Sequence, residues 1–376
     1  MAINKINVRS PFFVEISEAN LTSATLELYI YSDLGLAGSF ILNQTAINNA
    51  VSFEISDLIA GYLDANLTSF LVGSKWAEFQ VTRFLSGVAQ PKDASQVFIA
   101  LNAYGYLKEG INPTNLGTFS NSIFYRTKNS FVYVPLFIDN DTTLIFKKGG
   151  EILSSNLYIA DISSNENLPV TRSFTVNISQ LFAKTYCNYF ENRVIDDGGI
   201  IENRDLMKLN FNIYNDVFDG YYGADTIIIK DTASEKSYPV VVLEDTRYEP
   251  YFLTFINKFG EFQDIVFTGN DSTTLTKTNS SYKGVIKTSS GISALSRESR
   301  IYNTQMTSKI TLNSGFYPES FNEIFKQLLL SEEVWVTYDN DRYAVNIETS
   351  SFTLKKDLIN YTIVAEVANP IINYYR

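Results

Sequence analysis

The chain has 376 residues, of which 45% are hydrophobic and 19% charged, a composition that is too apolar for a disordered protein. It contains no histidine and one cysteine, Cys187, which excludes Ser-His-Asp and Cys-His catalysis, an intrachain disulfide and nearly every zinc site. The net charge of -11 argues against a nucleic-acid partner, because such partners are bound by clustered basic residues.

Targeting segments are not evident in the sequence. The first residues have neither the apolar core nor the cleavage signature of a signal peptide. No apolar run approaches the roughly 20 residues that span a bilayer. We therefore expect no membrane partner, and we expect folding in a reducing cytosol, which suits a single cysteine.

Alternating apolar and polar residues predict antiparallel β-strands with one face in the core. The clearest stretches are 25–31, 77–81, 207–213 and 359–367. Helical spacing is convincing only at 318–330, where Pro318 suits the first turn and apolar residues then line one face. The predicted fold is mainly β, with tandem antiparallel β-sandwich domains and a C-terminal β-rich domain that contains this one short helix.

A weak internal repeat suggests the domain boundaries. Residues 55–60 read ISDLIA and residues 178–183 read ISQLFA, each after a strand-like run and each with a serine placed to cap a short helical turn. The simplest interpretation is two related β-sandwich domains, 1–115 and 120–247, joined by a linker within 109–122. Coincidence among six common residues is the alternative interpretation. A third domain then covers 248–376.

The third domain opens with a predicted β-hairpin at 251–267, in which Gly260 supplies a positive φ at the turn. Both faces of its strands carry bulky apolar residues, so both must be covered, either by another domain of the chain or by an adjacent subunit in a closed ring. Lys258 and Glu261 are expected on an exposed turn. The polar stretch 268–292 predicts a long exposed hairpin or arm that orders against a neighbour.

Candidate metal-binding and phosphate-binding motifs are weak. No glycine-rich phosphate loop occurs. Asp and Asn cluster at 139–141, 196–197, 270–271 and 339–341. Such oxygens could bind Ca²⁺, but none of the clusters has the spacing of a calcium loop, and turns between strands explain them better. The cluster at 339–341 is expected at a hairpin tip.

Candidate catalytic residues are equally few. The nearest approach to the paired carboxylates of a glycosidase is Glu332 and Glu333 beside Trp335, or Glu261 with Phe262. Acidic residues next to strand aromatics are ordinary in an acidic β-protein. Tyrosine pairs at 221–222 and 374–375 could stack on sugars or lie in a protein interface. We therefore expect no catalytic, cofactor-binding or metal-binding residues, and no cofactor.

Four stretches resemble virion structural proteins of tailed bacteriophages, those of phages infecting Bacteroidetes most closely. They are INVRSPFFVEI at 6–16, FINKFGEFQDIVF at 255–267, GFYPESFNEIFKQLLLSEEVWV at 315–336 and SFTLKKDLINYTIVAEVANPIINYY at 351–375. The resemblance covers the N-terminal strand and most of the third domain, and none of its motifs is catalytic.

The resemblance implies a non-enzymatic tail or baseplate ring protein that assembles in the host cytoplasm and resides in the virion. Its partners would be further copies of itself, forming a ring, and other virion proteins. The alternative from a different class is a carbohydrate-binding or carbohydrate-degrading receptor-binding protein. Closed cyclic assemblies would favour the first function, and glycan binding by a small oligomer would favour the second.

Overall fold

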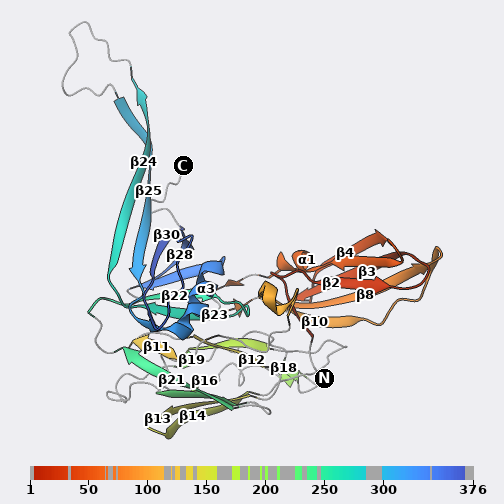
Figure 1. The fold of residues 1–376 in the computed structure, drawn as a ribbon, viewed down its shortest axis with the longest axis horizontal. Helices are drawn as coiled ribbons and strands as arrows, with labels where there is room; N and C mark the ends of the chain where they lie inside the picture. The colour runs from red at the N-terminus through yellow and green to blue at the C-terminus, as the bar shows by residue number, and fades with distance from the viewer. Residues whose placement is uncertain are drawn as a thin grey trace. The chain divides into compact units, whose positions relative to one another are not determined.

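The computed structural model describes 4–32, 35–63, 65–66, 71–72, 75–113, 120, 123–127, 133–138, 142–158, 172–177, 185–186, 195–196, 200–201, 210–211, 225–230, 235–243, 247–284, 299–338 and 341–368 (Figure 1). The chain forms two compact units. The first comprises Met1–Glu244 and Phe255–Asp264, and the second comprises Asp245–Thr254 and Ile265–Arg376. Both are mainly β, as the alternating patterns predict, whereas the three predicted domain boundaries stay a prediction.

The first unit begins with a sandwich of two sheets. The larger sheet has the order β1-β10-β8-β3-β4, with β9 beside β8. Its strands are β1 (Asn4–Asn7), β3 (Leu21–Ser32), β4 (Gly35–Thr45), β8 (Lys75–Leu85), β9 (Val88–Ala89) and β10 (Gln96–Leu101). The smaller sheet pairs β2 (Phe13–Ser17) with β5 (Ala50–Glu54). Leu26, Leu28 and Ile30 alternate along β3 and are fully buried in the core.

A second set of strands in the same unit has the same connectivity. The larger sheet has the order β11-β21-β20-β13-β14, and β12 pairs with β15. The bounds are β11 (Phe124–Thr127), β12 (Tyr133–Ile138), β13 (Thr142–Lys148), β14 (Glu151–Tyr158), β15 (Arg172–Asn177), β20 (Thr226–Lys230) and β21 (Glu235–Leu243). Strand by strand, in chain order, this set matches β1, β2, β3, β4, β5, β8 and β10.

The two sets also agree in the direction of their pairings. In each larger sheet the first strand runs parallel to the last, β1 beside β10 and β11 beside β21, whereas the other pairs are antiparallel. Alternation in the sequence predicts strands but not their direction, so the parallel pairs are a finding of the structure. The shared topology supports interpreting the short repeat as a duplication.

The repeat itself is partly described. Helix α1 (Ser56–Ala60) follows β5 as expected, whereas 178–183 lies outside the described residues. The predicted serine cap is wrong, because Ile55 occupies the N-cap position and its side chain makes no capping hydrogen bond. Instead the carboxylate of Glu54 accepts a hydrogen bond from the backbone N–H of Ser56 at 2.9 Å. An acidic side chain thus satisfies a backbone N–H group that has no partner within the first turn of the helix.

Four further short strand pairs occur in the described residues. They are β6 (Ala65–Asn66) with β7 (Leu71–Val72), β16 (Thr185–Tyr186) with β19 (Asn210–Phe211), β17 (Ile195–Asp196) with β18 (Ile200–Ile201), and β26 (Tyr317–Pro318) with β29 (Leu358–Ile359). The predicted strand at 207–213 is described only over β19. A 3-10 turn, η1 (Leu107–Glu109), follows β10.

A seven-stranded sheet has the order β23-β22-β27-β28-β30-β25-β24, and its residues belong to the second unit except for the parts of β22 and β23 within Phe255–Asp264. Its strands are β22 (Tyr251–Ile256), β23 (Phe262–Phe267), β24 (Asp271–Lys283), β25 (Ser299–Asn313), β27 (Val334–Tyr338), β28 (Asp341–Ile347) and β30 (Thr362–Val367). Strands β27 and β28 pair antiparallel up to Tyr338 and Asp341, as the hairpin predicted around 339–341 requires, and 339–340 lie outside the described residues.

The predicted helix near 318–330 is confirmed. The 3-10 turn η2 (Glu319–Phe321) leads into α3 (Asn322–Leu330). Phe325 is fully buried and its ring contacts those of Phe267, Tyr317 and Tyr361, which fixes the helix against the strands of its own unit. Among the described residues, no helix is long and apolar enough to cross a membrane.

Candidate functional site

The hairpin turn between β22 and β23 is organised by Asn257. Its side-chain oxygen accepts hydrogen bonds from the backbone N–H groups of Phe259 at 2.9 Å and Glu261 at 3.0 Å, and its amide donates to Gln263 at 3.0 Å. Gly260 has φ +84°, and a Cβ there would lie 3.0 Å from the carbonyl carbon of Asn102. Glycine is therefore required by the backbone conformation and by the neighbouring chain, which confirms the predicted positive φ.

Lys258 joins this turn to the segment that follows β10. Its ammonium lies 2.6 Å from a carboxylate oxygen of Glu109 and 4.6 Å from the ring centre of Tyr106. Its carbonyl accepts the backbone N–H of Tyr104 at 2.9 Å. The Lys258 side chain is only 9% exposed, so the ion pair and the aromatic face replace most of the water that a free ammonium would bind.

The carboxyl of Glu109 responds to this environment. Partial burial raises the pKa of Glu109. The hydrogen bonds from the Lys258 ammonium and from the backbone N–H of Tyr106 lower it by more, so the pKa lies below its ordinary value. Glu109 is thus ionised at neutral pH and balances the lysine charge. The arrangement is a structural lock, because the buried ion pair ties the hairpin turn to the segment that follows β10.

These contacts correct the prediction of an exposed turn. Lys258 is 7% exposed and Glu261 is 2% exposed as whole residues, and every residue of β22 and β23 is buried. The turn is covered by residues 102–109 of its own chain, so the alternative in which another domain of the same chain covers it is the one that the structure favours. Glu261 and Phe262 accordingly do not line an open cleft of the kind that a glycosidase needs.

The other carboxylate pair is placed on a surface loop. Glu332 and Glu333 are exposed neighbours between α3 and β27, and Trp335 follows, half-buried, on β27. Burial, and then the negative charge of Glu332, raise the pKa of Glu333. Because the two carboxylates are consecutive on one loop, they do not face each other across a substrate cleft as a glycosidase pair does.

A polar aromatic face, which the sequence reasoning did not single out, lies on the outer side of the first large sheet. Tyr29 on β3 lies opposite Glu78 on β8. The Tyr29 hydroxyl donates to Glu27 at 2.8 Å, the Tyr31 hydroxyl donates to Glu78 at 3.1 Å, and the Lys92 ammonium lies 2.6 Å from Glu27. The sequence signal is the alternation in ELYIY at 27–31, whose polar and aromatic members share one side.

The ionisation of this face is fixed at neutral pH. Hydrogen bonds from Lys92 and then Tyr29 lower the pKa of Glu27, and the hydrogen bond to Glu27 raises the pKa of Tyr29. Burial, followed by the hydrogen bond to Glu78, raises the pKa of Tyr31 to about 12. Glu27 is therefore ionised and both phenols are neutral at neutral pH, which suits recognition by hydrogen bonds and ring contacts better than acid–base chemistry.

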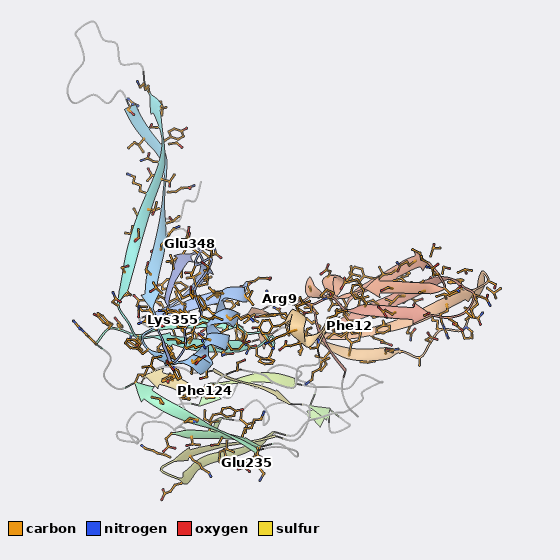
Figure 2. All side chains as sticks on the ribbon, in the orientation of Figure 1. Arg9, Phe12, Phe124, Glu235, Glu348 and Lys355 are labelled. Atoms are coloured by element: carbon orange, nitrogen blue, oxygen red, sulfur yellow. The ribbon has the colours of Figure 1, made fainter. Side chains whose placement is uncertain are left out.

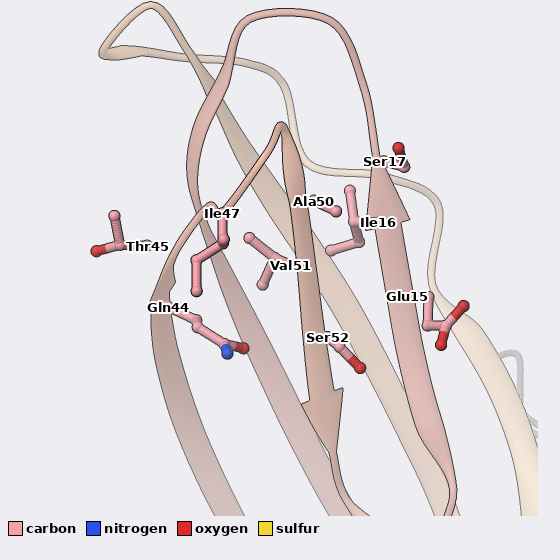
Figure 3. Close-up of a pocket in the computed structure, with 9 residues that line it drawn as sticks. All are labelled: Glu15, Ile16, Ser17, Gln44, Thr45, Ile47, Ala50, Val51 and Ser52. Atoms are coloured by element: carbon pink, nitrogen blue, oxygen red, sulfur yellow. The ribbon is translucent and has the colours of Figure 1, made fainter.

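A hollow of about 560 Å³ opens at one end of the first sandwich (Figure 3). It is lined by Glu15, Ile16, Ser17, Gln44, Thr45, Ile47, Ala50, Val51 and Ser52. Figure 3 shows that Ile16, Ile47 and Val51 point toward one another across it, whereas Glu15 points away. With Glu15 as the sole titratable residue of its lining, the hollow lacks a paired acid and base.

No group of three or more Asp, Glu, Cys or His that could hold a metal ion occurs among the described residues. Asp271 begins β24 and its carboxylate accepts the Tyr251 hydroxyl at 2.9 Å. The clusters at 139–141 and the residues Asp197 and Cys187, like the tyrosine pairs 221–222 and 374–375, lie outside the described residues.

Comparison with known proteins adds no assignment to this geometry. No protein-family model matches the chain, and no curated protein matches it.

Proposed function

We propose that the chain is a non-enzymatic structural component of a tailed phage virion, a tail or baseplate ring protein that assembles in the host cytoplasm through β-rich interfaces. The observation that carries the proposal is the combination of a repeated β-sandwich topology with a long two-stranded ribbon, β24–β25, in which twelve of the thirteen residues of β24 are exposed. This architecture offers sheet faces and strand edges to neighbours, and strand edges are ready templates for pairing.

The chemistry of the described side chains supports a role without catalysis. Lys258 and Glu109 hold a turn in place, and the carboxylates of the polar aromatic face are bound by tyrosine hydroxyls and a lysine. Groups fixed in this way act as structural contacts, whereas a general acid or base needs a pKa near the working pH. The resemblance of four stretches to virion structural proteins points in the same direction.

The proposed partners are further copies of the chain and other virion proteins. A heterologous contact that closes after a fixed rotation produces a ring. The test is electron microscopy of the purified protein, together with antibody labelling of purified particles. Closed rings and a labelled layer are expected. Particles that lack the protein, although the infected host makes it, would contradict the proposal.

A carbohydrate-binding or carbohydrate-degrading receptor-binding protein is the second candidate, and the polar aromatic face favours it. Tyr29 and Tyr31 lie beside two carboxylates on a sheet surface, and such sets can stack on and hydrogen-bond to sugar rings. Binding to surface polysaccharide that is lost in Tyr29→Ala but kept in Tyr29→Phe would support it. Release of reducing ends that disappears in Glu332→Gln would support a degrading enzyme.

A further inference from the structure

The ribbon β24–β25 extends from the seven-stranded sheet of the second unit (Figure 1). Strand β25 pairs with β30 only over Lys309–Asn313, so among the described residues 299–308 pair with β24 alone. We call 272–283 and 299–308 the distal ribbon. At about 3.4 Å per residue it reaches about 40 Å. Most of its described side chains are exposed, and they stand out from both faces of the ribbon (Figure 2).

The distal ribbon is basic in an acidic protein. It contains Lys277, Lys283 and Arg300 and no Asp or Glu. The whole chain has a net charge of -11, so all other residues together carry a net charge of -14. At the base of the ribbon, Lys309 is paired with Glu348 and Glu366, but these acids lie beside β25 where it joins the sheet. The positive charge farther out has no acidic residue within the distal ribbon to balance it.

Large apolar side chains are exposed on the same segment. Leu275 and Ile301 are each 58% exposed, and the rings of Tyr282 and Tyr302 meet edge to face at 5.8 Å. A two-stranded ribbon cannot bury such side chains by itself and is at best marginally stable in water. In addition, within the described residues the outer edge of β24 has no partner strand, which leaves backbone donors and acceptors available for pairing.

We propose that the distal ribbon docks on an acidic surface of a second copy of this chain. The charge of the two surfaces is complementary, because the ribbon is basic and the rest of each copy is strongly acidic. A partner that pairs with the open edge of β24 must supply alternating N–H and C=O groups, which a polypeptide backbone has and a nucleic acid lacks. The ribbon is also long enough to reach beyond its own sheet. The inference rests on the proposed self-assembly and names the element that carries it.

Zero-length cross-linking of mixed ¹⁴N and ¹⁵N protein tests this contact directly. A carbodiimide joins a lysine amine to a carboxylate within ion-pair distance, and the isotope pattern separates links between copies from links within one copy. We expect mixed-isotope links from Lys277 or Lys283 to Asp or Glu residues. If these two lysines form only same-copy links, or none, while the full-length protein is oligomeric, the proposal is overturned.

Charge reversal supplies the quantitative test. In the ribbon variant Lys277→Glu/Lys283→Glu/Arg300→Glu, we expect the self-association constant from analytical ultracentrifugation to weaken by at least roughly tenfold. The matched control is Lys236→Glu/Arg247→Glu/Lys356→Glu, which makes the same charge change at exposed residues outside the ribbon. Added salt should weaken association of the unaltered protein more than that of the ribbon variant.

Three outcomes would overturn the inference. They are equal association of the two variants, a monomeric unaltered protein at every concentration, and ribbon-dependent binding of duplex DNA without self-association. The virion role is tested separately. If association depends on the ribbon but the protein is absent from particles, only the virion role is contradicted. If the ribbon variant associates and enters particles as well as the unaltered protein does, only this inference is contradicted.

Discussion

The hairpin β22–β23 and the ribbon β24–β25 follow each other in the chain, but they differ in how far their residues are buried. Every residue of β22 and β23 is buried, whereas twelve of the thirteen residues of β24 are exposed. Both are pairs of neighbouring strands in the same sheet, so secondary structure does not explain the difference. The composition of their faces does. In the hairpin both faces carry large apolar residues, and in the ribbon Thr, Ser and Asn dominate both faces.

The two regions also differ in how their polar and charged groups are placed. The hairpin turn is held by Asn257, Gly260 and Lys258 against residues 102–109, so its hydrogen bonds and charges are satisfied inside one chain. The ribbon keeps three basic side chains and exposed apolar ones at its surface, and these groups have no core to enter. The hairpin therefore contributes to the stability of the chain, and the ribbon is the element that we propose for assembly.

Hydrogen exchange should give the largest contrast between the two regions. In the isolated monomer, amides of β22 and β23 should exchange at least about a thousandfold more slowly than those of 272–283. The reason is that the buried hairpin amides exchange only when the folded unit unfolds, whereas the exposed ribbon can open locally. Mass spectrometry of pulse-labelled protein measures both. Strong protection of 272–283 in a protein verified to be monomeric would contradict the expectation that this stretch orders against a neighbour.

Aromatic truncation should separate the regions almost as clearly. Phe262 is fully buried, so Phe262→Ala should lower the free energy of unfolding by about 3–5 kcal/mol, through lost transfer energy and a residual cavity. Tyr302 is 51% exposed, so the control Tyr302→Ala should change it by no more than about 0.5 kcal/mol. Urea denaturation followed by circular dichroism provides both values. Equal losses would show that burial does not distinguish the two elements.

Removal of the lysine charge in the hairpin turn should have an intermediate effect. Lys258→Met leaves Glu109 without its ion-pair partner, and since the Glu109 side chain remains 29% exposed, the loss of stability should be about 1–3 kcal/mol. A double-mutant cycle with Glu109→Gln isolates the pair, because the second change removes the stranded charge. A coupling energy near zero would contradict the lock.

The same pair predicts a pH dependence with a definite sign. The pKa of Glu109 is lower in the folded protein than its ordinary value of 4.5, so its contribution is fully present above that value and is lost as the pH falls through the folded-state pKa. The difference in unfolding free energy between the unaltered protein and Glu109→Gln should therefore shrink on acidification. A difference that grows at low pH would exclude this explanation.

The smallest effect is expected at the base of the ribbon. Lys309 lies beside Glu348 and Glu366, as Lys258 lies beside Glu109, but its side chain is 33% exposed. Solvent screens such a pair, so Lys309→Met should destabilise less than Lys258→Met in the same denaturation experiment. If Lys309→Met proves the more damaging change, the ribbon depends on its ion pairs more than its exposure indicates.

Much of the fold could be predicted from local patterns. Alternation predicts the strands, the spacing of Phe321, Ile324 and Phe325 predicts the helix, and Gly260 predicts the turn, since each signal is read from residues close in sequence. The serine cap before α1 was wrong because Glu54 binds the helix start instead. The polar aromatic face was missed because Glu78 joins Tyr29 from a strand about fifty residues away.

The sequence by itself determined that this protein is mainly β, that the hairpin at 251–267 is apolar on both faces and that the stretch 268–292 is polar. Only the tertiary structure decided which strands pair, including the parallel pairs of β1 with β10 and β11 with β21, and that residues 102–109 cover the hairpin turn. The physical reason is that side-chain alternation is a local property, whereas a strand's partner and a buried charge's counter-ion are chosen among groups far apart in the chain.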